Sequence, residues 1–373
     1  MTDFKVTPWE VSGNIDYDAL VERFGTSRID PALKERLASY GGLHPLLKRE
    51  IFYSHRDLDW ILDLYDKGEP FFLYTGRGPS GGTHLGHLLP WIFAKHLQET
   101  FGVMMYFQLT DDEKFLFRPE LELKDTRAMA YDNALDFMAL GFDPEKTRII
   151  LDTACIDRLY PLALKVSKKV TFSTARAVFG FDNSTNIGSI FYTSIQAAPC
   201  FLESDMKGKK VPCLIPCGID QDPHFRVARD VAPSLGYYKP ALIHNKMFPG
   251  LEGGDKMSSS NPDATIYTTD SPGTVKRKVG RAFTGGCVSA EEQREKGGSP
   301  EVCAVFKYNY FLFEEDDSRI DELASRCRSG DILCGECKKF LSSKINAFLA
   351  EHQKKREAVK DIIDDVTLDG FEW

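Results

Sequence analysis

Phe71-Phe-Leu-Tyr-Thr-Gly-Arg-Gly-Pro-Ser-Gly-Gly-Thr-His-Leu-Gly-His87 is the most informative segment of the chain. Its aromatic, uncharged start, residues 71–74, predicts a buried strand because turn-forming residues follow it. A glycine-rich loop comes next, and from about Thr83 to Leu97 apolar residues recur at helical spacing. Glycine lets a ligand approach the backbone closely, and a helix start offers unpaired N–H groups. Strand, loop and helix together predict an anion-binding site.

Two histidines, His84 and His87, lie three residues apart and so share one face of the first helical turn. Gly76-x-Gly78-x-x-Gly81 matches the dinucleotide-binding fingerprint, although that fingerprint does not include the histidines. A Walker loop is excluded, because no Lys-Ser or Lys-Thr follows at a suitable spacing. Thr83-His84-Leu85-Gly86-His87 resembles the signature of class I aminoacyl-tRNA synthetases. On this segment alone, an ordinary tight turn between a strand and a helix stays open.

The composition is that of a globular protein. The chain has 373 residues, enough for about two domains, with 42% hydrophobic and 27% charged residues. A net charge of -8 excludes a uniformly basic nucleic-acid-binding protein, so a polyanion would have to bind to local patches. Nine cysteines, an odd number, indicate reduced thiols rather than a disulfide framework. With no signal peptide and no apolar run of about 18 residues, we expect a cytoplasmic protein.

The rest of the first 270 residues alternates strands with helices, which predicts an α/β fold with a Rossmann-type, doubly wound parallel sheet. Further buried strands are expected at 103–109, 147–151 and 211–216. A helix is expected from about 123 to 140. Polar residues follow two of the strands, at 110–114 and at 217–223, and ligands bind at the carboxyl edge of such sheets.

The pattern changes to helices beyond about residue 270. We therefore expect three segments: an N-terminal extension at 1–50, a Rossmann-type catalytic domain at 51–270 and an α-helical domain at 271–373. The catalytic segment includes a Gly- and Ser-rich loop that carries Lys256-Met-Ser-Ser-Ser260. A lysine on a flexible loop is able to close on a phosphate as negative charge develops there.

The loops at 83–87 and 256–260, in this order and on this fold, make the chain similar to class I aminoacyl-tRNA synthetases. Within that class it resembles the tryptophanyl-tRNA synthetases of the eukaryotic and archaeal type. The resemblance covers nearly the whole chain and runs through Tyr74-Thr-Gly-Arg-Gly-Pro-Ser80, Thr110-Asp-Asp-Glu-Lys114, Ile195-Gln-Ala-Ala-Pro199, Ile219-Asp-Gln-Asp-Pro223 and Lys256-Met-Ser-Ser-Ser260.

The resemblance implies a ligase that activates tryptophan with ATP to tryptophanyl-adenylate, releases pyrophosphate and transfers the tryptophanyl group to tRNA(Trp). Adenylation needs positioning and charge neutralisation more than acid–base catalysis. Mg²⁺ is expected to accompany ATP, held mainly by phosphate oxygens. The resemblance further implies a homodimer, and an anticodon-binding role for the helices of 271–373.

The resemblance also assigns site residues. The catalytic residues are His84, His87, Lys256, Ser258 and Ser259. The ATP-binding residues are Arg77, Gly78, Thr83, His84, Gly86, His87, Lys114, Lys256 and Met257. The tryptophan-binding residues are Tyr74, Gly76, Gln108, Glu113, Gln196, Cys217 and Gln221. An indole needs apolar walls and an acceptor for its N–H, to which Tyr74 and Gln108 correspond. The ammonium needs acceptors, to which Glu113, Gln196 and Gln221 correspond.

Three alternatives stay open. A tyrosyl-tRNA synthetase would share the architecture and both signature loops, and amino-acid preference would distinguish it. An NAD-dependent dehydrogenase rests only on Gly76-x-Gly78-x-x-Gly81 and leaves Lys256-Met-Ser-Ser-Ser260 unexplained. A non-catalytic binding protein on the same fold would not need the histidines and the lysine intact.

Two cysteine pairs, Cys213-x-x-x-Cys217 and Cys334-x-x-Cys337, invite a zinc interpretation. Zinc needs four well-spaced ligands. The first pair has no plausible second half beyond Cys200, and the second pair lies in a helical segment with no partner pair or histidine nearby. We therefore expect structural thiols and no metal, with a redox role open for the second pair. A basic run, Lys276-Arg277-Lys278 with Arg281, suits RNA phosphates.

Overall fold

The computed structural model describes residues 5–6, 11–13, 15–254, 256–257 and 261–368 of the chain. Two predicted catalytic residues, Ser258 and Ser259, lie outside the described residues. No helix among the described residues has the length and apolar character needed to span a membrane.

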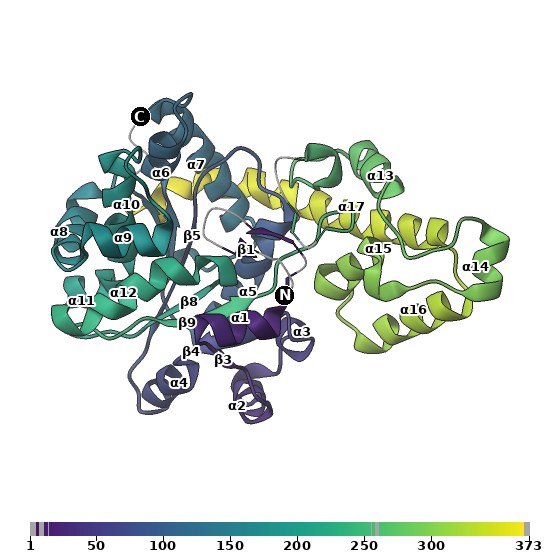
Figure 1. The fold of residues 1–373 in the computed structure, drawn as a ribbon, viewed down its shortest axis with the longest axis horizontal. Coiled ribbons are helices and arrows are strands. Elements are labelled where there is room, and N and C mark those ends of the chain that lie inside the picture. The colour runs from purple at the N-terminus through teal and green to yellow at the C-terminus, as the bar shows by residue number, and fades with distance from the viewer. Residues whose placement is uncertain (1–4, 7–10, 14, 255, 258–260, 369–373) are drawn as a thin grey trace. The chain divides into compact units, whose positions relative to one another are not determined.

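A seven-stranded sheet forms the centre of the fold, in the order β3-β4-β9-β8-β5-β6-β7 (Figure 1). The strands are β3 Ser27–Arg28, β4 Phe52–Arg56, β5 Phe72–Arg77, β6 Met105–Leu109, β7 Thr147–Leu151, β8 Cys213–Gly218 and β9 Ala241–Asn245. The five strands from β9 to β7 are parallel, whereas β3 and β4 join antiparallel at one edge. The predicted parallel α/β sheet is confirmed. A separate short ribbon pairs β1 Lys5–Val6 with β2 Val11–Ser12.

Strand β3, of two residues, was not predicted, and neither were the two longer strands β4 and β9. Both carry a histidine and other polar residues although they are buried, which obscures the apolar pattern of a buried strand. The structure shows how such residues are tolerated: Ser54 Oγ lies 3.1 Å from His244 Nδ1 across the pair of strands. A polar group buried with a hydrogen-bond partner avoids most of the desolvation cost.

Helices cover both faces of the sheet. The helices of this part of the chain are α1 Tyr17–Phe24, α2 Pro31–Gly41, α3 Pro45–Lys48, α4 Leu58–Asp66, α5 Leu85–Phe101, α6 Asp111–Phe117, α7 Leu123–Met138, α8 Ile156–Ser167, α9 Phe172–Phe179, α10 Ile187–Ala197, α11 Leu202–Lys207 and α12 Asp222–Leu235. Tyr106 belongs to the core with α8, α10 and α12, which lie together in Figure 1. Its neighbour Phe107 points to the other face, where it stacks on Phe137 of α7 at 3.8 Å and meets Trp91 of α5 edge-on.

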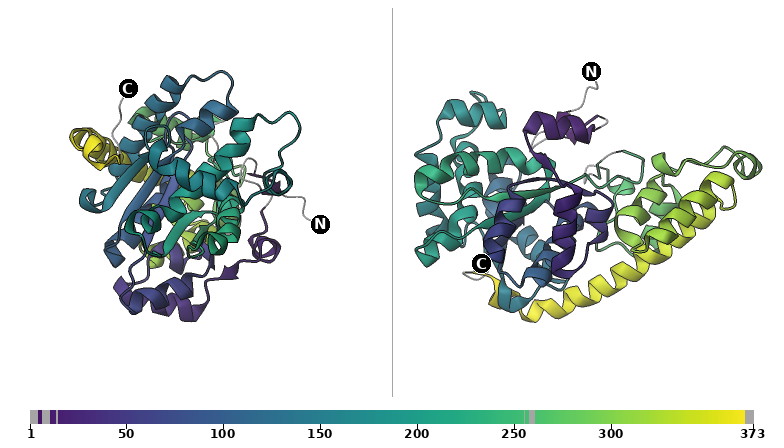
Figure 2. Two further views of the ribbon diagram at one scale, coloured as in Figure 1. Left: turned by 90° about the vertical axis from the view of Figure 1, so that its left-hand side faces the viewer. Right: turned by 90° about the horizontal axis from the view of Figure 1, so that it is seen from below.

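The chain divides into two compact units. The sheet unit contains the described residues within 1–81, 90–246 and 356–368, and the helical unit contains those within 82–89 and 247–355. The helices after residue 270 are α13 Pro272–Gly280, α14 Ala290–Lys296, α15 Ala304–Tyr308, α16 Asp317–Ser329, α17 Cys334–Ala358 and α18 Ile363–Val366. Figure 2 shows α17, in yellow, as one continuous helix. These units divide the chain at other places than the expected boundaries near 50 and 270, whose functional meaning stays a prediction.

The last described residues, 356–368, belong to the sheet unit. Arg356 forms ion pairs with Asp132 and Asp136 on α7, the second at 3.3 Å. The N–H of Leu368 then donates to the carbonyl of Ile149 at 2.8 Å, beside β7. These contacts explain why the C-terminal residues belong to the sheet unit although α17 begins in the helical unit.

Candidate active site

Three predicted tryptophan-binding residues meet in the sheet unit. Tyr74 and Gln108 lie on the adjacent parallel strands β5 and β6, and both side chains are fully buried. The Tyr74 hydroxyl lies 2.5 Å from Gln108 Oε1 and 3.1 Å from the carbonyl oxygen of Gln196 on α10. Gln196 Nε2 in turn donates to the Tyr74 hydroxyl at 3.2 Å. The structure therefore brings Tyr74, Gln108 and Gln196 together, as predicted.

A fourth residue, Asp152, belongs to this group and was missed from the sequence. Gln108 Nε2 donates to both carboxyl oxygens of Asp152, at 2.8 and 3.0 Å. This bond orients the Gln108 amide, because its nitrogen faces Asp152 and its oxygen must then face Tyr74. The signal was available: Asp152 directly follows the strand expected at 147–151, which pairs with the strand that carries Gln108.

Carboxyl groups concentrate next to this hydrogen-bonded group. Burial raises the pKa of Asp152 above its usual range, and the nearby Asp112 and Asp111 raise it further. Glu113, a predicted ligand of the ammonium, accepts from Thr110 Oγ1 at 2.8 Å and from Lys114 Nζ at 3.0 Å. Carboxyl groups that repel one another in a buried place are stabilised by an added cation.

Two predicted glycines allow this close packing. A Cβ atom at Gly76 would lie 2.7 Å from the carbonyl oxygen of Gln108, so no side chain fits there. A Cβ atom at Gly78 would collide with a carboxyl oxygen of Glu113 and lie 2.7 Å from Cε of Lys114. Gly76 needs glycine because the nearby atom belongs to the backbone, whereas at Gly78 the nearby atoms are the ends of two flexible side chains. Arg77, between them, is buried at the end of β5.

The other predicted residues of this unit follow β8. Cys217 is buried in the same hydrophobic cluster as Tyr74. Gln221 lies in the turn Ile219–Gln221 before α12 and is half-buried. Within the part of the chain that the structure describes, no hydrogen bond joins the Gln221 side chain to the other predicted residues.

The two histidines lie in the helical unit, where α5 begins. Their rings stack, with centroids 3.5 Å apart and an interplanar angle of 23°. The backbone N–H of His84 donates to His87 Nδ1 at 3.2 Å. Since Nδ1 acts as the acceptor, a neutral His87 carries its hydrogen on Nε2, where it is a donor. The helix begins at Leu85, two residues later than predicted.

In the helical unit, the loop that carries Lys256 and Met257 lies close to these histidines. A Cβ atom at Gly86 would lie 3.1 Å from the His84 ring and 3.6 Å from Cβ of Met257. Met257 is buried, whereas Lys256 is exposed. The carbonyl of Thr83 accepts from the N–H of Thr268 at 2.9 Å, which joins the segment before α5 to the segment around residue 268. The predicted ATP-binding residues at 83–87 and 256–257 thus lie in one unit, whereas Arg77, Gly78 and Lys114 belong to the sheet unit.

The basic run at 276–281 is only partly available to a ligand. Lys278 is buried, with Nζ 2.7 Å from Asp270 Oδ2 and 2.8 Å from the carbonyl of Thr265. The suggestion that Lys278 contacts RNA phosphates is therefore wrong, because its charge already has a buried partner. Lys276 and Arg281 are exposed.

Comparisons with known proteins agree with one another. Residues 66–350 match the family described as tRNA synthetases class I (W and Y). Among curated relatives, the tryptophan–tRNA ligase of Pyrobaculum calidifontis is 51% identical, over 98% of each chain. That of Saccharolobus solfataricus is also 51% identical, over 99% of this chain and 96% of its own. Among solved structures, the tryptophanyl-tRNA synthetase of Plasmodium falciparum is similar with a TM-score of 0.88 and 38% identity, over 94% of this chain and 96% of that chain.

Proposed function

The chain belongs to the tryptophan–tRNA ligases, which are class I aminoacyl-tRNA synthetases, and from this membership we propose how its residues share the reaction. The ligase joins tryptophan to tRNA, so the tyrosyl, dehydrogenase and non-catalytic alternatives are set aside. In the proposal, the sheet unit recognises tryptophan, and the helical unit binds the phosphates of ATP and stabilises the charge that develops on them.

The observation that carries the proposal is the hydrogen-bonded series Asp152–Gln108–Tyr74. Asp152 holds the Gln108 amide so that its oxygen and the Tyr74 hydroxyl face each other. The indole N–H is a donor without acceptor capacity, and these two oxygens supply acceptors in a buried, aromatic place. A tyrosine hydroxyl would need a different set of partners, and buried polar groups left unpaired would penalise it.

The ammonium of tryptophan would bind where carboxyl groups concentrate. Glu113 and the side chains of Gln196 and Gln221 are the acceptors that we assign to it. Burial raises the pKa of Asp112, and Asp111 and Glu113 add to this, although a hydrogen bond to Asp152 opposes it. A cationic group beside these carboxyl groups would relieve their mutual repulsion, which supports this assignment.

ATP would place its phosphates at the start of α5. Unpaired N–H groups and the positive end of the helix dipole attract phosphate there, and His87 Nε2–H is a further donor. Arg77, Gly78 and Lys114 are the residues of the sheet unit that we assign to ATP. Lys256, exposed on its loop, would neutralise the pyrophosphate as it leaves.

Mg²⁺ would arrive with ATP rather than occupy a protein cage. In the described conformation, no three His, Cys, Asp or Glu side chains among the described residues are placed to hold a metal ion together. Mg²⁺ commonly keeps several waters and binds to substrate phosphates with few protein ligands.

We also propose that the chain forms a homodimer through α8. Ile156, Tyr160 and Leu164 recur every fourth residue along this helix, and each is 40% to 48% exposed. Residues at this spacing share one helix face, and a second copy of the chain would bury this apolar stripe. In sedimentation experiments, Tyr160→Asp should give monomers, whereas Met206→Asp, an exposed apolar residue on α11, should not. A monomeric parent chain would contradict the proposal.

The exchange of pyrophosphate into ATP, measured without tRNA for tryptophan, tyrosine and phenylalanine, tests the division of roles. We expect exchange with tryptophan alone. Gln108→Leu should weaken the response to tryptophan strongly, because the leucine side chain can form neither the hydrogen bond to Asp152 nor the one to Tyr74. Gln98→Leu is the matched control, since Gln98 is buried in the same unit but bonds to Thr147 and the carbonyl of Lys146. Equal losses in both variants would overturn the assignment of Gln108.

A further inference from the structure

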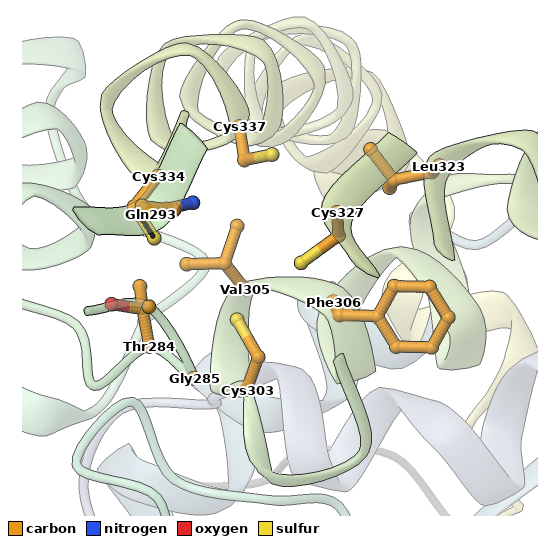
Figure 3. A pocket seen from close by; sticks show the side chains of 11 residues that line it. Thr284, Gly285, Gln293, Cys303, Val305, Phe306, Leu323, Cys327, Cys334 and Cys337 are labelled. Atoms are coloured by element: carbon orange, nitrogen blue, oxygen red, sulfur yellow. Dashed lines mark hydrogen bonds between the residues drawn. The ribbon is translucent and has the colours of Figure 1, made fainter. Parts of the chain in front are cut away.

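Four cysteines line one small cavity in the helical unit, and we call it the four-cysteine pocket (Figure 3). Its volume is about 20 Å³. Cys303 precedes α15, Cys327 lies near the end of α16, and Cys334 and Cys337 form the first turn of α17. From sequence spacing alone, Cys334 and Cys337 have no second pair of cysteines. In the fold, Cys303 and Cys327 line the same cavity.

The side chains are arranged around a common space. Figure 3 shows the Cys303, Cys327 and Cys337 side chains directed toward the space around Val305, whereas Cys334 lies at its rim beside Gln293. The Cys334 thiol is 3.3 Å from Gln293 Oε1. Apart from this amide and Thr284, the cavity is lined by apolar side chains and glycines. It contains no carboxylate and no imidazole, so sulfur is its dominant ligand chemistry.

Glycines let the surrounding loop approach the cysteines. A Cβ atom at Gly298 would lie 3.0 Å from the Cys327 sulfur, and one at Gly286 would collide with the Cys334 sulfur. The N–H of Gly298 donates to the carbonyl of Cys327 at 2.8 Å. Gly330, with φ of 80°, would place a Cβ atom 2.5 Å from the carbonyl of Gln293. At Gly330 the close atoms belong to the backbone, so this position tolerates no side chain, whereas at Gly286 and Gly298 the nearest atoms are the cysteine sulfurs.

The four thiols differ in exposure. The Cys303 side chain is buried, whereas Cys327, Cys334 and Cys337 are partly exposed. Leucine or valine would fill a small apolar cavity equally well, so packing alone does not require four cysteines at this place.

We propose that the four-cysteine pocket binds a thiophilic metal centre, either a zinc ion or an iron–sulfur cluster. Sets of four cysteines with no oxygen ligand select these centres. The thiols would lose their protons on binding, and the positive metal would compensate the thiolate charges. The centre would join α16, α17 and the segment before α15, which meet at the pocket through few apolar side chains.

Binding requires the cysteines to turn. In the described conformation, no three metal-binding side chains of the described residues, these thiols included, surround one point at ligand distance. A cysteine side chain has one rotatable bond to its sulfur, so this adjustment needs new rotamers and small shifts of Val305 rather than a new backbone. The free energy of metal binding by four thiolates greatly exceeds the cost of such rotations.

Metal analysis of the full-length chain, purified without oxygen from cells supplied with zinc and iron, tests the proposal. We expect about one zinc per chain, or iron with acid-labile sulfide and a visible absorption that dithionite bleaches. The two results distinguish the centres, and either supports the site. A chain that contains neither metal, or that carries a Cys334–Cys337 disulfide in place of a metal, would overturn it.

Variants locate the metal. Cys337→Ser should lower metal affinity at least roughly tenfold, since even the loss of an outer hydrogen-bond partner of a ligand has an effect of that size. Cys287→Ser is the matched control, because the Cys287 thiol points to the carbonyl of Gly297 at 3.4 Å and does not line the cavity. Equal loss in both variants would contradict the site. If Cys337→Ser does not fold, X-ray absorption of the parent chain decides: nearest neighbours that are all sulfur support the pocket, and nitrogen or oxygen neighbours overturn it.

Discussion

The residues assigned to tryptophan and those assigned to the phosphates are held in different ways. In the sheet unit, Tyr74, Gln108 and Asp152 are fully buried and each orients the next. In the helical unit, His87 is fixed by capping the start of α5, but Lys256 is exposed between glycine-rich and serine-rich neighbours. A preorganised pocket suits recognition of a rigid ring in the ground state. A lysine on an exposed loop suits charge that appears only in the transition state.

Replacing the exposed lysine should separate the two roles most clearly. For Lys256→Ala we expect kcat of the exchange reaction to fall about 100- to 1,000-fold, as for the loss of one donor to a developing charge. Tryptophan affinity, measured by equilibrium binding, should stay within about twofold, because uniform binding is unaffected. Lys276→Ala, an exposed lysine of the same unit, is the control and should change neither quantity. Parallel losses in kcat and in tryptophan affinity would remove the contrast between the units.

Replacing the buried carboxylate should give the opposite pattern. Asp152→Asn replaces the carboxyl group by an amide, which no longer holds Gln108 in one orientation. We expect KM for tryptophan to rise about 5- to 150-fold, because leaving a buried polar group without its partner costs about 1 to 3 kcal/mol. KM for ATP should stay unchanged. Asp205→Asn, which removes an exposed partner of Lys165, serves as the control. A change confined to kcat would show that Asp152 does not act through the pocket.

The comparison also explains what the sequence could predict. The parallel sheet and both signature loops follow from local patterns, such as the apolar run 71–74 and the glycines after it. Gln108 lies near the end of β6, and Tyr74 lies on the adjacent parallel strand β5, so the topology of the sheet brings their side chains together. These features depend on short segments whose meaning does not require the rest of the fold.

Other features depend on pairing across the chain and were missed. Asp152 becomes a pocket residue only because β7 lies beside β6. His244 interrupts the apolar pattern of the strand at 241–245, and its hydrogen-bond partner Ser54 is far away in sequence. Cys334 and Cys337 gain Cys303 and Cys327 as neighbours only through the packing of α15 to α17. Lys278 has the sequence environment of a surface lysine but is buried against Asp270.

The dependence of the free energy of unfolding on acid pH should test how much one buried ion pair stabilises the sheet unit. Asp222, directly after Gln221, receives two hydrogen bonds from Arg56, at 2.6 and 2.8 Å, and lies 3.2 Å from His244 Nε2. Burial opposes its ionisation, but the bonds from Arg56 and His244 outweigh burial and lower its pKa to about 2. Because the folded-state pKa is lowered, the stabilisation is complete above the ordinary carboxyl pKa and is lost as the pH falls toward 2.

Urea unfolding at a series of pH values measures this contribution. We expect the free energy of unfolding to decrease by about 2 kcal/mol between roughly pH 5 and pH 2 because of Asp222. The Asp222→Asn variant should lack this part of the decrease. Asp263→Asn, which removes an exposed partner of Arg277, should retain it. An unchanged acid dependence in Asp222→Asn would mean that the ion pair does not secure the start of α12.

The smallest effect is expected from a single hydroxyl of the pocket. Tyr74→Phe keeps the ring and its edge contact with Phe225 but removes the atom that joins Gln108 and Gln196. We expect tryptophan affinity to fall about three- to tenfold, since one neutral hydrogen bond contributes about 1 kcal/mol. Tyr106→Phe, which loses a buried hydroxyl bonded to Glu203 in the same unit, is the matched control. If Tyr74→Phe also admitted phenylalanine in the exchange reaction, the hydroxyl would contribute to selectivity as well as to affinity. If its affinity for tryptophan were unchanged, the indole N–H would have to bind to Gln108 alone.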